Sequence, residues 1–567
     1  MRKSTSRRQI SLRMRLILPL ALIVSALAGM TACGGGGYSS SSSTTPTEPS
    51  VMFSSTSLTF SSQQVGSSSA AQSVTLTNSG DATLMISGIS ITGTDAGDFT
   101  QMNTCGSSLN ASANCTISVT FKPTAAGSRT ASVSVADNAT GSPQTVSLTG
   151  TGAGTSAGSG AISKAFFGMV PAFGTSFPYA NLWPTVPVGT MVLVDTTQWG
   201  SIERKQGVYT WTDLDNAIQE AESNGTTSIV YNVFGVPSFY TTNGSTCSDG
   251  CPGPPTDMQA FTNFITALVN RYKGQITYYE FWNEVNFPTR WTGTTAQFVS
   301  LVQAAYPIIK QIDPNAKVLA PSLGVASNFS SFLQNYLSQG GASVTDGLSW
   351  HTFPCSAPST PGSTSGLTCL QAASCSNTLD CAGAPLVSLV QTVQAAEQAA
   401  GVANLPLYNT SGSWGKNQNL PDLSDQEAYM ARWYIIQASE GVAFAAWYGW
   451  GGDPSDPSAW GSIFDANTDQ TTEAAAAYTT AYNWLQGSTM NGPCSVDSSN
   501  VWTCALTFSN KNTGLIVWNG DNTSSSYTPQ SKYAQYETLT STSASSVAGG
   551  TVTIGESPIL LESGSRP

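Results

Sequence analysis

The strongest candidates for reactive side chains lie in the segment from Tyr278 to Glu284, which ends in the pair Asn283-Glu284. The aromatic and apolar residues before this pair predict a buried strand, so the pair falls where the strand ends. A carboxyl group at such an edge can donate a proton and later accept one, which is general acid/base catalysis. Glu284 is our candidate for that group. The alternative is a surface Asn-Glu pair in a loop with no chemical role.

A histidine and several tryptophans also fall at predicted strand ends. His351 is the only histidine of the chain. It either lines a cleft or is a buried, hydrogen-bonded residue of the core. Aromatic rings at strand ends can present a face to a ligand. We expect at least one of three tryptophans to contact a ligand, although each one can equally belong to the core: Trp414, Trp447 and Trp450.

Strands alternate with helices over residues 163–487. Leu214, Ile218 and Ala221 recur at helical spacing within the helix expected over Thr212–Gly225. Ser424 and Glu427 predict a capping box at the start of a later helix. Repeated strand-then-helix order predicts a (β/α)₈ TIM barrel, whose active site lies at the carboxyl ends of its strands. The strands are expected near Met191–Val194, Ile229–Tyr231, Ile276–Phe281, Val318–Ala320, Leu348–Trp350, Leu405–Tyr408 and Val442–Trp447.

This region resembles the clan A glycoside hydrolases. The run from Phe281 to Asn286 is similar to members of families thirty-nine and five, in which an Asn-Glu pair follows the fourth strand. The resemblance implies that Glu284 is the catalytic acid/base and that Asn283 binds the 2-hydroxyl of a sugar. It also implies that His351, on strand six, lines the substrate cleft.

The same resemblance reveals a departure at the second carboxylate, the nucleophile that retaining members carry at the end of strand seven. The segment from Leu405 to Gly415 follows the family pattern but has Ser411 at that position. Strand two departs as well, because Val192 and Val194 stand where relatives often have Arg and Trp. Asp195 remains there as a substrate-binding candidate. Losing a nucleophile costs about six decades of rate, or roughly 8 kcal/mol, so activity is expected to be reduced or lost.

Two further consequences follow from the serine. Removing a negative neighbour is expected to lower the pKa of Glu284. The small Ser411 also leaves room for a water that Asp195 or Glu203 could activate, which would be an inverting route; otherwise Glu203 is expected to be structural. Two functions stay open: a hydrolase of O-glycosyl bonds in a polysaccharide or oligosaccharide, and a non-catalytic cell-surface protein that binds carbohydrate.

The first 33 residues have the pattern of an export signal, in which basic residues precede the apolar run Leu16–Leu27. The segment from Met30 to Cys33 resembles the lipobox of bacterial lipoproteins, in which Cys33 would be lipidated. The alternative is an ordinary cleaved signal peptide. Residues 34–50 predict a flexible tether. We expect an exported lipoprotein at the cell surface or facing the periplasm, otherwise a secreted protein, that meets the membrane only through its lipid anchor.

Two β-rich regions complete the chain. Residues 51–152 show short alternating runs typical of a β-sandwich. Phrases such as Gly97-Asp-Phe and Phe121-Lys-Pro resemble immunoglobulin-like modules of the Hydin and abnormal-spindle type. Such a module is expected to be a spacer, with sugar binding as the alternative. Residues 153–162 predict a linker, and residues 488–567 predict a small C-terminal β-sandwich-like domain.

The 11 cysteines leave an even number once Cys33 is set aside, which favours disulfides in an oxidising compartment. With one histidine, a zinc site is the weaker alternative, and no cofactor or metal is expected. A net charge of −12 argues against nucleic acid and suits a neutral glycan. Local spacing predicts the pairs Cys105–Cys115, Cys247–Cys251 and Cys494–Cys504, while pairing within Cys355, Cys369, Cys375 and Cys381 stays open.

Overall fold

The computed structural model divides the chain into two compact units, residues 1–47 and 48–567. Almost all of the first unit, with the expected signal peptide and Cys33, lies outside the described residues. None of the described helices is long and apolar enough to cross a membrane. The structure describes residues 47–60, 63–64, 68–124, 127–153, 160–170, 183–194, 197–242, 247, 250–353, 382–402, 405–452, 460–465, 467–521, 523–541, 543–547 and 550–567.

The N-terminal domain consists of two sheets around a core of its own. Alternation builds that core: in β4 every second residue, Val74, Leu76 and Asn78, is buried. This confirms the expected sandwich-like fold. One sheet has the order β1 (Val51–Phe53), β4 (Gln72–Asn78), β8 (Asn114–Phe121) and β6 (Phe99–Asn103). The other has the order β2 (Ser57–Thr59), β10 (Gln144–Ala153), β9 (Gly127–Asp137), β5 (Leu84–Thr92) and β7 (Ser108–Leu109), with β3 (Gln63–Gln64) also paired to β10.

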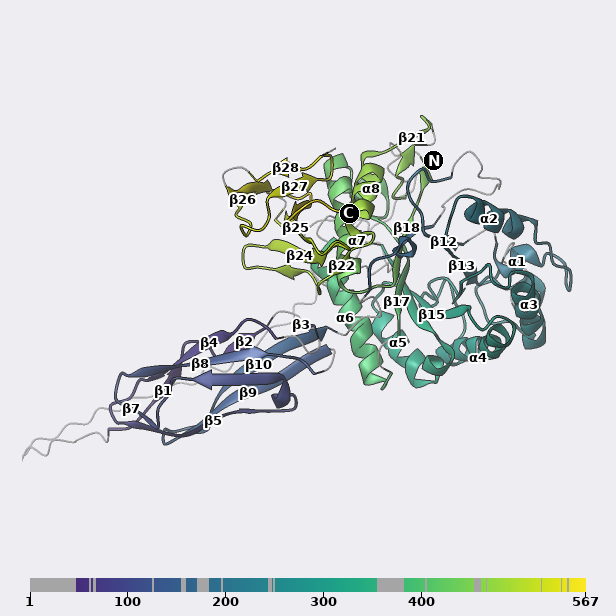
Figure 1. Ribbon diagram of the computed structural model, residues 1–567. Coiled ribbons are helices and arrows are strands. Elements are labelled where there is room, and N and C mark those ends of the chain that lie inside the picture. Colours follow the sequence, from purple (N-terminus) through teal and green to yellow (C-terminus); the bar gives the residue numbers. More distant parts are fainter. Residues whose placement is uncertain are drawn as a thin grey trace, which may run out of the picture. The chain divides into compact units, whose positions relative to one another are not determined.

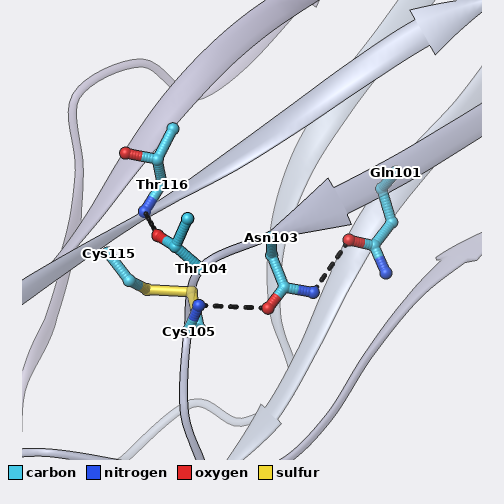
Figure 2. The surroundings of a disulfide bond; sticks show 6 residues. All are labelled: Gln101, Asn103, Thr104, Cys105, Cys115 and Thr116. Atoms are coloured by element: carbon cyan, nitrogen blue, oxygen red, sulfur yellow. Dashed lines mark hydrogen bonds between the residues drawn. A yellow bond between two sulfur atoms is a disulfide. The ribbon is translucent and has the colours of Figure 1, made fainter.

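A disulfide joins the segment after β6 to the second residue of β8. Figure 2 shows the Cys105–Cys115 bond and the hydrogen bonds beside it. The Cys105 amide donates to Asn103 Oδ1 at 3.1 Å, and the Thr116 amide donates to Thr104 Oγ1 at 3.0 Å. The loop is therefore held to the sheet by covalent and polar links together.

Eight parallel strands close into a barrel in chain order, since β11 pairs with both β12 and β18. The TIM-barrel expectation is confirmed. The first strand had no counterpart in the sequence prediction. The strands are β11 (Phe167–Val170), β12 (Thr190–Leu193), β13 (Ser228–Val233), β14 (Tyr278–Phe281), β15 (Lys317–Gly324), β16 (Gly347–Thr352), β17 (Leu407–Gly412) and β18 (Phe444–Tyr448).

Helices cover the outside of the barrel, as α2 to α5 do in Figure 1. The apolar face predicted for α2 is confirmed, since Leu214, Ile218 and Ala221 are buried. In α3, Phe261 and Phe264 are buried and Asp257 caps the first turn. The helices are α1 (Trp199–Ile202), α2 (Thr212–Ser223), α3 (Met258–Arg271), α4 (Thr295–Ile312), α5 (Phe329–Ser338), α6 (Ala384–Ala399), α7 (Leu423–Ser439) and α8 (Glu473–Leu485).

The start of α7 corrects one sequence prediction. The N-cap is Asp422, whose side chain accepts a hydrogen bond from the Ser424 amide at 3.0 Å. Ser424 therefore lies inside the first turn, and its pattern with Glu427 is not a capping box. An aspartate two residues earlier caps the helix instead, with its side chain on the Ser424 amide.

The C-terminal strands share a hydrophobic core with the barrel through residues such as Trp502, Leu506 and Trp518. Arg432 of α7 donates through Nε to the Glu556 carbonyl at 2.9 Å. The main sheet has the order β22 (Thr489–Met490), β24 (Val501–Thr507), β25 (Thr513–Asn519), β30 (Ile559–Glu562), β27 (Gln535–Thr538) and β28 (Ser545–Ser546), with β23 (Ser495–Val496) on β24. Two small sheets comprise β26 (Ser525–Tyr527) with β29 (Val552–Ile554), and β19 (Gly451–Gly452) with β20 (Phe464–Asp465) and β21 (Gln470–Thr471).

Candidate active site

A pocket of about 160 Å³ opens at the carboxyl ends of the barrel strands. This is the end where TIM-barrel enzymes place their catalytic groups. Four residues singled out from the sequence meet there: Asn283, Glu284, His351 and Ser411. The remaining lining residues are Val170, Val194, Arg290, Phe353, Tyr448 and Trp460.

A strained turn after β14 brings Glu284 into the pocket. Trp282 and Glu284 both have positive φ angles, 71° and 55°, which residues other than glycine rarely adopt. Such conformations cost about 1–3 kcal/mol each and persist where the surroundings fix them. Here the Trp282 ring donates to the Arg290 carbonyl at 2.7 Å, and the Val285 amide donates to the Ser322 carbonyl at 2.9 Å. The Glu284 side chain is left 18% exposed and faces the pocket.

Two basic side chains flank the Glu284 carboxylate. His351 Nδ1 lies 3.5 Å from Oε1, and Arg290 Nε lies 3.9 Å from Oε2. Burial alone would raise the pKa of Glu284, but the hydrogen bond from His351 and the charges of His351 and Arg290 bring it below its ordinary value of 4.5. Glu284 is therefore ionised at neutral pH.

His351 is both a buried residue and a pocket residue, so the two alternatives for it coincide. Its Nε2 lies 3.2 Å from the hydroxyl of Ser322, which is fully buried in β15. With Nδ1 turned to Glu284, both ring nitrogens have partners within the protein. The ring is thus fixed in orientation between the barrel interior and the pocket.

Ser411 lies next to His351 in register, because β16 pairs with β17 through these two residues. Its side chain lines the pocket from the end of strand seven. Among the described lining residues, Glu284 is the sole carboxylate. Asp195 lies outside the described residues, whereas its neighbour Val194 lines the pocket and Val192 packs inside the barrel.

Glu203 has a structural environment, as expected. Its carboxylate accepts hydrogen bonds from the Trp199 ring at 2.6 Å, the Gly207 amide at 2.7 Å and the Tyr240 hydroxyl at 3.1 Å. The side chain is buried by these partners. It therefore holds the segment after strand two together and does not line the pocket.

The three predicted tryptophans do not line the pocket. Trp414, Trp447 and Trp450 are fully buried, and the rings of Trp414 and Trp447 pack 4.9 Å apart. Instead, the aromatic residues at the pocket are Phe353, Tyr448 and Trp460. Position at a strand end led to the right region, but sequence does not show which rings turn into the core.

A buried carboxylate beneath the pocket escaped the sequence analysis. Glu280 accepts hydrogen bonds from Thr410 Oγ1 at 2.6 Å and from Asn232 Nδ2 at 3.0 Å. The three residues belong to β14, β17 and β13 and are all buried. They connect the strand that leads to Glu284 with the strand that carries Ser411.

The disulfide predictions are confirmed where the structure describes the cysteines: Cys105–Cys115, Cys247–Cys251 and Cys494–Cys504 are bonded. Residues 354–381, with the other four cysteines of the barrel, lie outside the described residues. Within the described ranges, no group of three or more His, Cys, Asp or Glu side chains is arranged to hold a metal ion.

Comparison with solved structures identifies the architecture. The chain is similar to a family 39 glycoside hydrolase from the gut symbiont Bacteroides cellulosilyticus WH2, with a TM-score of 0.54, 16% identity, and coverage of 89% of this chain and 98% of that one. The two chains share their fold. A monomeric β-xylosidase from Caulobacter crescentus CB15 matches with a TM-score of 0.48 and 14% identity, covering 71% of this chain and 97% of that one.

Sequence comparisons add one family. The family model of Cep192 domain 4 matches residues 48–153, the range of the N-terminal sandwich. The narrower likeness to Hydin and abnormal-spindle modules stays a prediction. No curated protein matches the chain.

Proposed function

We propose that the pocket binds a carbohydrate and that the protein is a glycoside hydrolase homologue acting on O-glycosyl bonds of a polysaccharide or oligosaccharide. Glu284 is its acid/base, and turnover is reduced because Ser411 stands at the nucleophile position. The observation that carries this proposal is the placement of Glu284 at the pocket surface, at the carboxyl end of strand four. Asn283 beside it offers an amide for a sugar hydroxyl.

The chemistry of the pocket favours slow turnover. A retaining hydrolase needs a protonated acid to release the leaving sugar and a carboxylate to attack the sugar carbon. Glu284 has a lowered pKa, so at neutral pH it is ionised and rarely holds a proton to donate. A serine hydroxyl attacks only when a base removes its proton, and the nitrogens of His351 are turned to Glu284 and Ser322.

A second function, carbohydrate binding without cleavage, is favoured by Ser411. A serine at the end of strand seven leaves Glu284 without a second carboxylate among the described lining residues. Such a pocket keeps the surface that recognises a sugar while it lacks one of the two groups that cut it. Binding without product would identify this function.

The two functions separate in one experiment with the purified full-length protein. Reducing-sugar release and binding are measured on a panel of β-linked oligosaccharides for the native chain, Glu284→Gln and the control Glu222→Gln, an exposed residue of α2 away from the pocket. A hydrolase releases sugar in the native chain and the control but not in Glu284→Gln. A binding protein releases none in any variant and binds in all. Absence of both binding and release would contradict both functions.

We also propose that the protein is exported and anchored through a lipid on Cys33, with the sandwich as a spacer. The disulfides within the described residues support an oxidising compartment. Labelling of cells with an alkyne fatty acid should mark the native chain and not Cys33→Ala. Equal labelling of the two would contradict the anchor.

A further inference from the structure

The pocket has two chemically different sides. Asn283, Glu284 and Arg290 follow β14, whereas Tyr448 and Trp460 belong to the end of β18 and the segment after it. In the closed barrel, three strands separate β14 from β18 in either direction. The charged groups and these aromatic groups therefore face each other across the mouth of the barrel.

The aromatic side is a corner of three rings. The ring centroids of Phe353 and Trp460 lie 5.4 Å apart at 88°, those of Phe353 and Tyr448 lie 5.6 Å apart at 88°, and those of Tyr448 and Trp460 lie 6.1 Å apart at 85°. Edge-to-face contacts of this kind are favourable and fix the relative orientation of rings. The corner is thus a preformed apolar surface.

Trp460 is the exposed member of this corner, with 41% of its surface accessible. Its backbone is nevertheless held tightly. It forms an antiparallel bridge with Lys416, and its carbonyl lies so close to Gly449, whose φ is +98°, that a Cβ at 449 would overlap it at 2.2 Å. An exposed indole on a fixed backbone, at the rim of a pocket, is a surface prepared for a ligand.

We propose that Trp460, backed by Phe353 and Tyr448, is the surface on which the bound sugar ring stacks. A pyranose ring has an apolar face of C–H groups and a rim of hydroxyls. With its face on Trp460, the ring directs polar groups across the pocket to Asn283 and Glu284. This assignment rests on the proposed carbohydrate function and gives the ligand its orientation; the buried Trp414, Trp447 and Trp450 serve the core.

Titration of the full-length protein with cellotetraose, xylotetraose and mannotetraose tests the assignment, with dissociation constants measured by calorimetry. Trp460→Ala should weaken binding of the preferred tetrasaccharide by about tenfold or more, and Trp460→Phe should weaken it less because a flat ring remains. Phe239→Ala is the matched control, since Phe239 is also 41% exposed and does not line the pocket. It should leave the dissociation constant unchanged.

Tryptophan fluorescence separates contact from a structural effect. Ligand should change the emission of the native chain and of Phe239→Ala, and this change should be lost in Trp460→Phe although that variant still binds. Native affinity in Trp460→Ala, or an unchanged fluorescence response in Trp460→Phe, would overturn the assignment while the carbohydrate function stands. If the native chain binds none of the three tetrasaccharides, the carbohydrate function fails and this assignment fails with it.

Discussion

At the scale of single residues, the site depends on how Glu284 holds its charge. His351 and Arg290 stabilise the ionised carboxylate against the cost of burial. Because the folded pKa lies below the ordinary value of 4.5, this interaction contributes its full stability above pH 4.5. The contribution is lost as the pH falls through the folded pKa.

Replacing His351 tests this account. His351→Gln removes the hydrogen bond and the charge interaction by which His351 lowers the pKa of Glu284, so that pKa should rise towards or above 4.5. The titration is followed by carbon NMR of protein labelled at the glutamate carboxyls, with Glu284→Gln used to assign the signal. Arg290→Gln, whose guanidinium is farther away, should raise the pKa less. An unchanged midpoint in His351→Gln would show that the histidine does not set this charge.

Most of the candidate site residues could be predicted from the sequence. The runs around Asn283, Glu284, His351 and Ser411 sit at strand ends, and the barrel brings strand ends to one place. The aromatic residues were misjudged, because burial of a ring depends on packing from distant segments. Trp460 lies in the segment after strand eight, where periodicity gives no signal for its position.

At the scale of elements, the Glu280 network connects strands four and seven beneath the pocket. Removing a hydrogen-bond donor from a buried carboxylate costs about 1–3 kcal/mol of stability. Thr410→Val removes the hydroxyl at 2.6 Å from Glu280 while keeping nearly the same volume. We expect Thr410→Val to lower the free energy of unfolding by this amount, measured by urea denaturation.

Thr410→Ser is the control, because it keeps the hydroxyl and removes only a methyl group. Its stability should lie closer to that of the native chain than to that of Thr410→Val. Equal losses in the two variants would assign the effect to packing of the methyl group and not to the bond with Glu280.

Elements were predictable where a pattern repeats and uncertain at their ends. Apolar spacing located α2 because one face of it is buried. The four-residue strand β11 was not predicted, since such a short apolar run has no period of its own. The start of α7 was misplaced because Ser424 and Glu427 match a capping box, while Asp422 makes the bond.

At the scale of the whole molecule, the N-terminal sandwich has a hydrophobic core separate from that of the barrel. The Cys105–Cys115 disulfide closes a loop within that sandwich, with a sequence separation of 10. Replacing both cysteines by serine should lower the stability of this domain by about 2–3 kcal/mol, chiefly by enlarging the unfolded ensemble.

Calorimetric unfolding of the full chain measures this effect. The transition of the sandwich should shift to lower temperature, while the affinity of the pocket for oligosaccharide stays the same. A changed affinity would show that the sandwich contributes to ligand binding, against its assignment as a spacer.

The domain order was predictable because each region has its own pattern: alternation in the sandwich and the C-terminal strands, and strand-then-helix repeats in the barrel. Disulfides between close cysteines were predictable from spacing, as in Cys494–Cys504. The shared core of the barrel and the C-terminal sheet was not, since contacts such as Arg432 with the Glu556 carbonyl join residues far apart in sequence.

We propose that Ser411 stands where a retaining hydrolase carries its nucleophile, in a pocket where Glu284 is the acid/base. The test is reducing-sugar release by the native chain and by Ser411→Glu, measured side by side on the same β-linked oligosaccharides. The added carboxylate supplies the nucleophile and, as a like charge near Glu284, raises the pKa of Glu284 towards that of a proton donor. We expect Ser411→Glu to release sugar faster than the native chain by orders of magnitude. Vigorous release by the native chain, or none by the variant on a glycan that it binds, would contradict it.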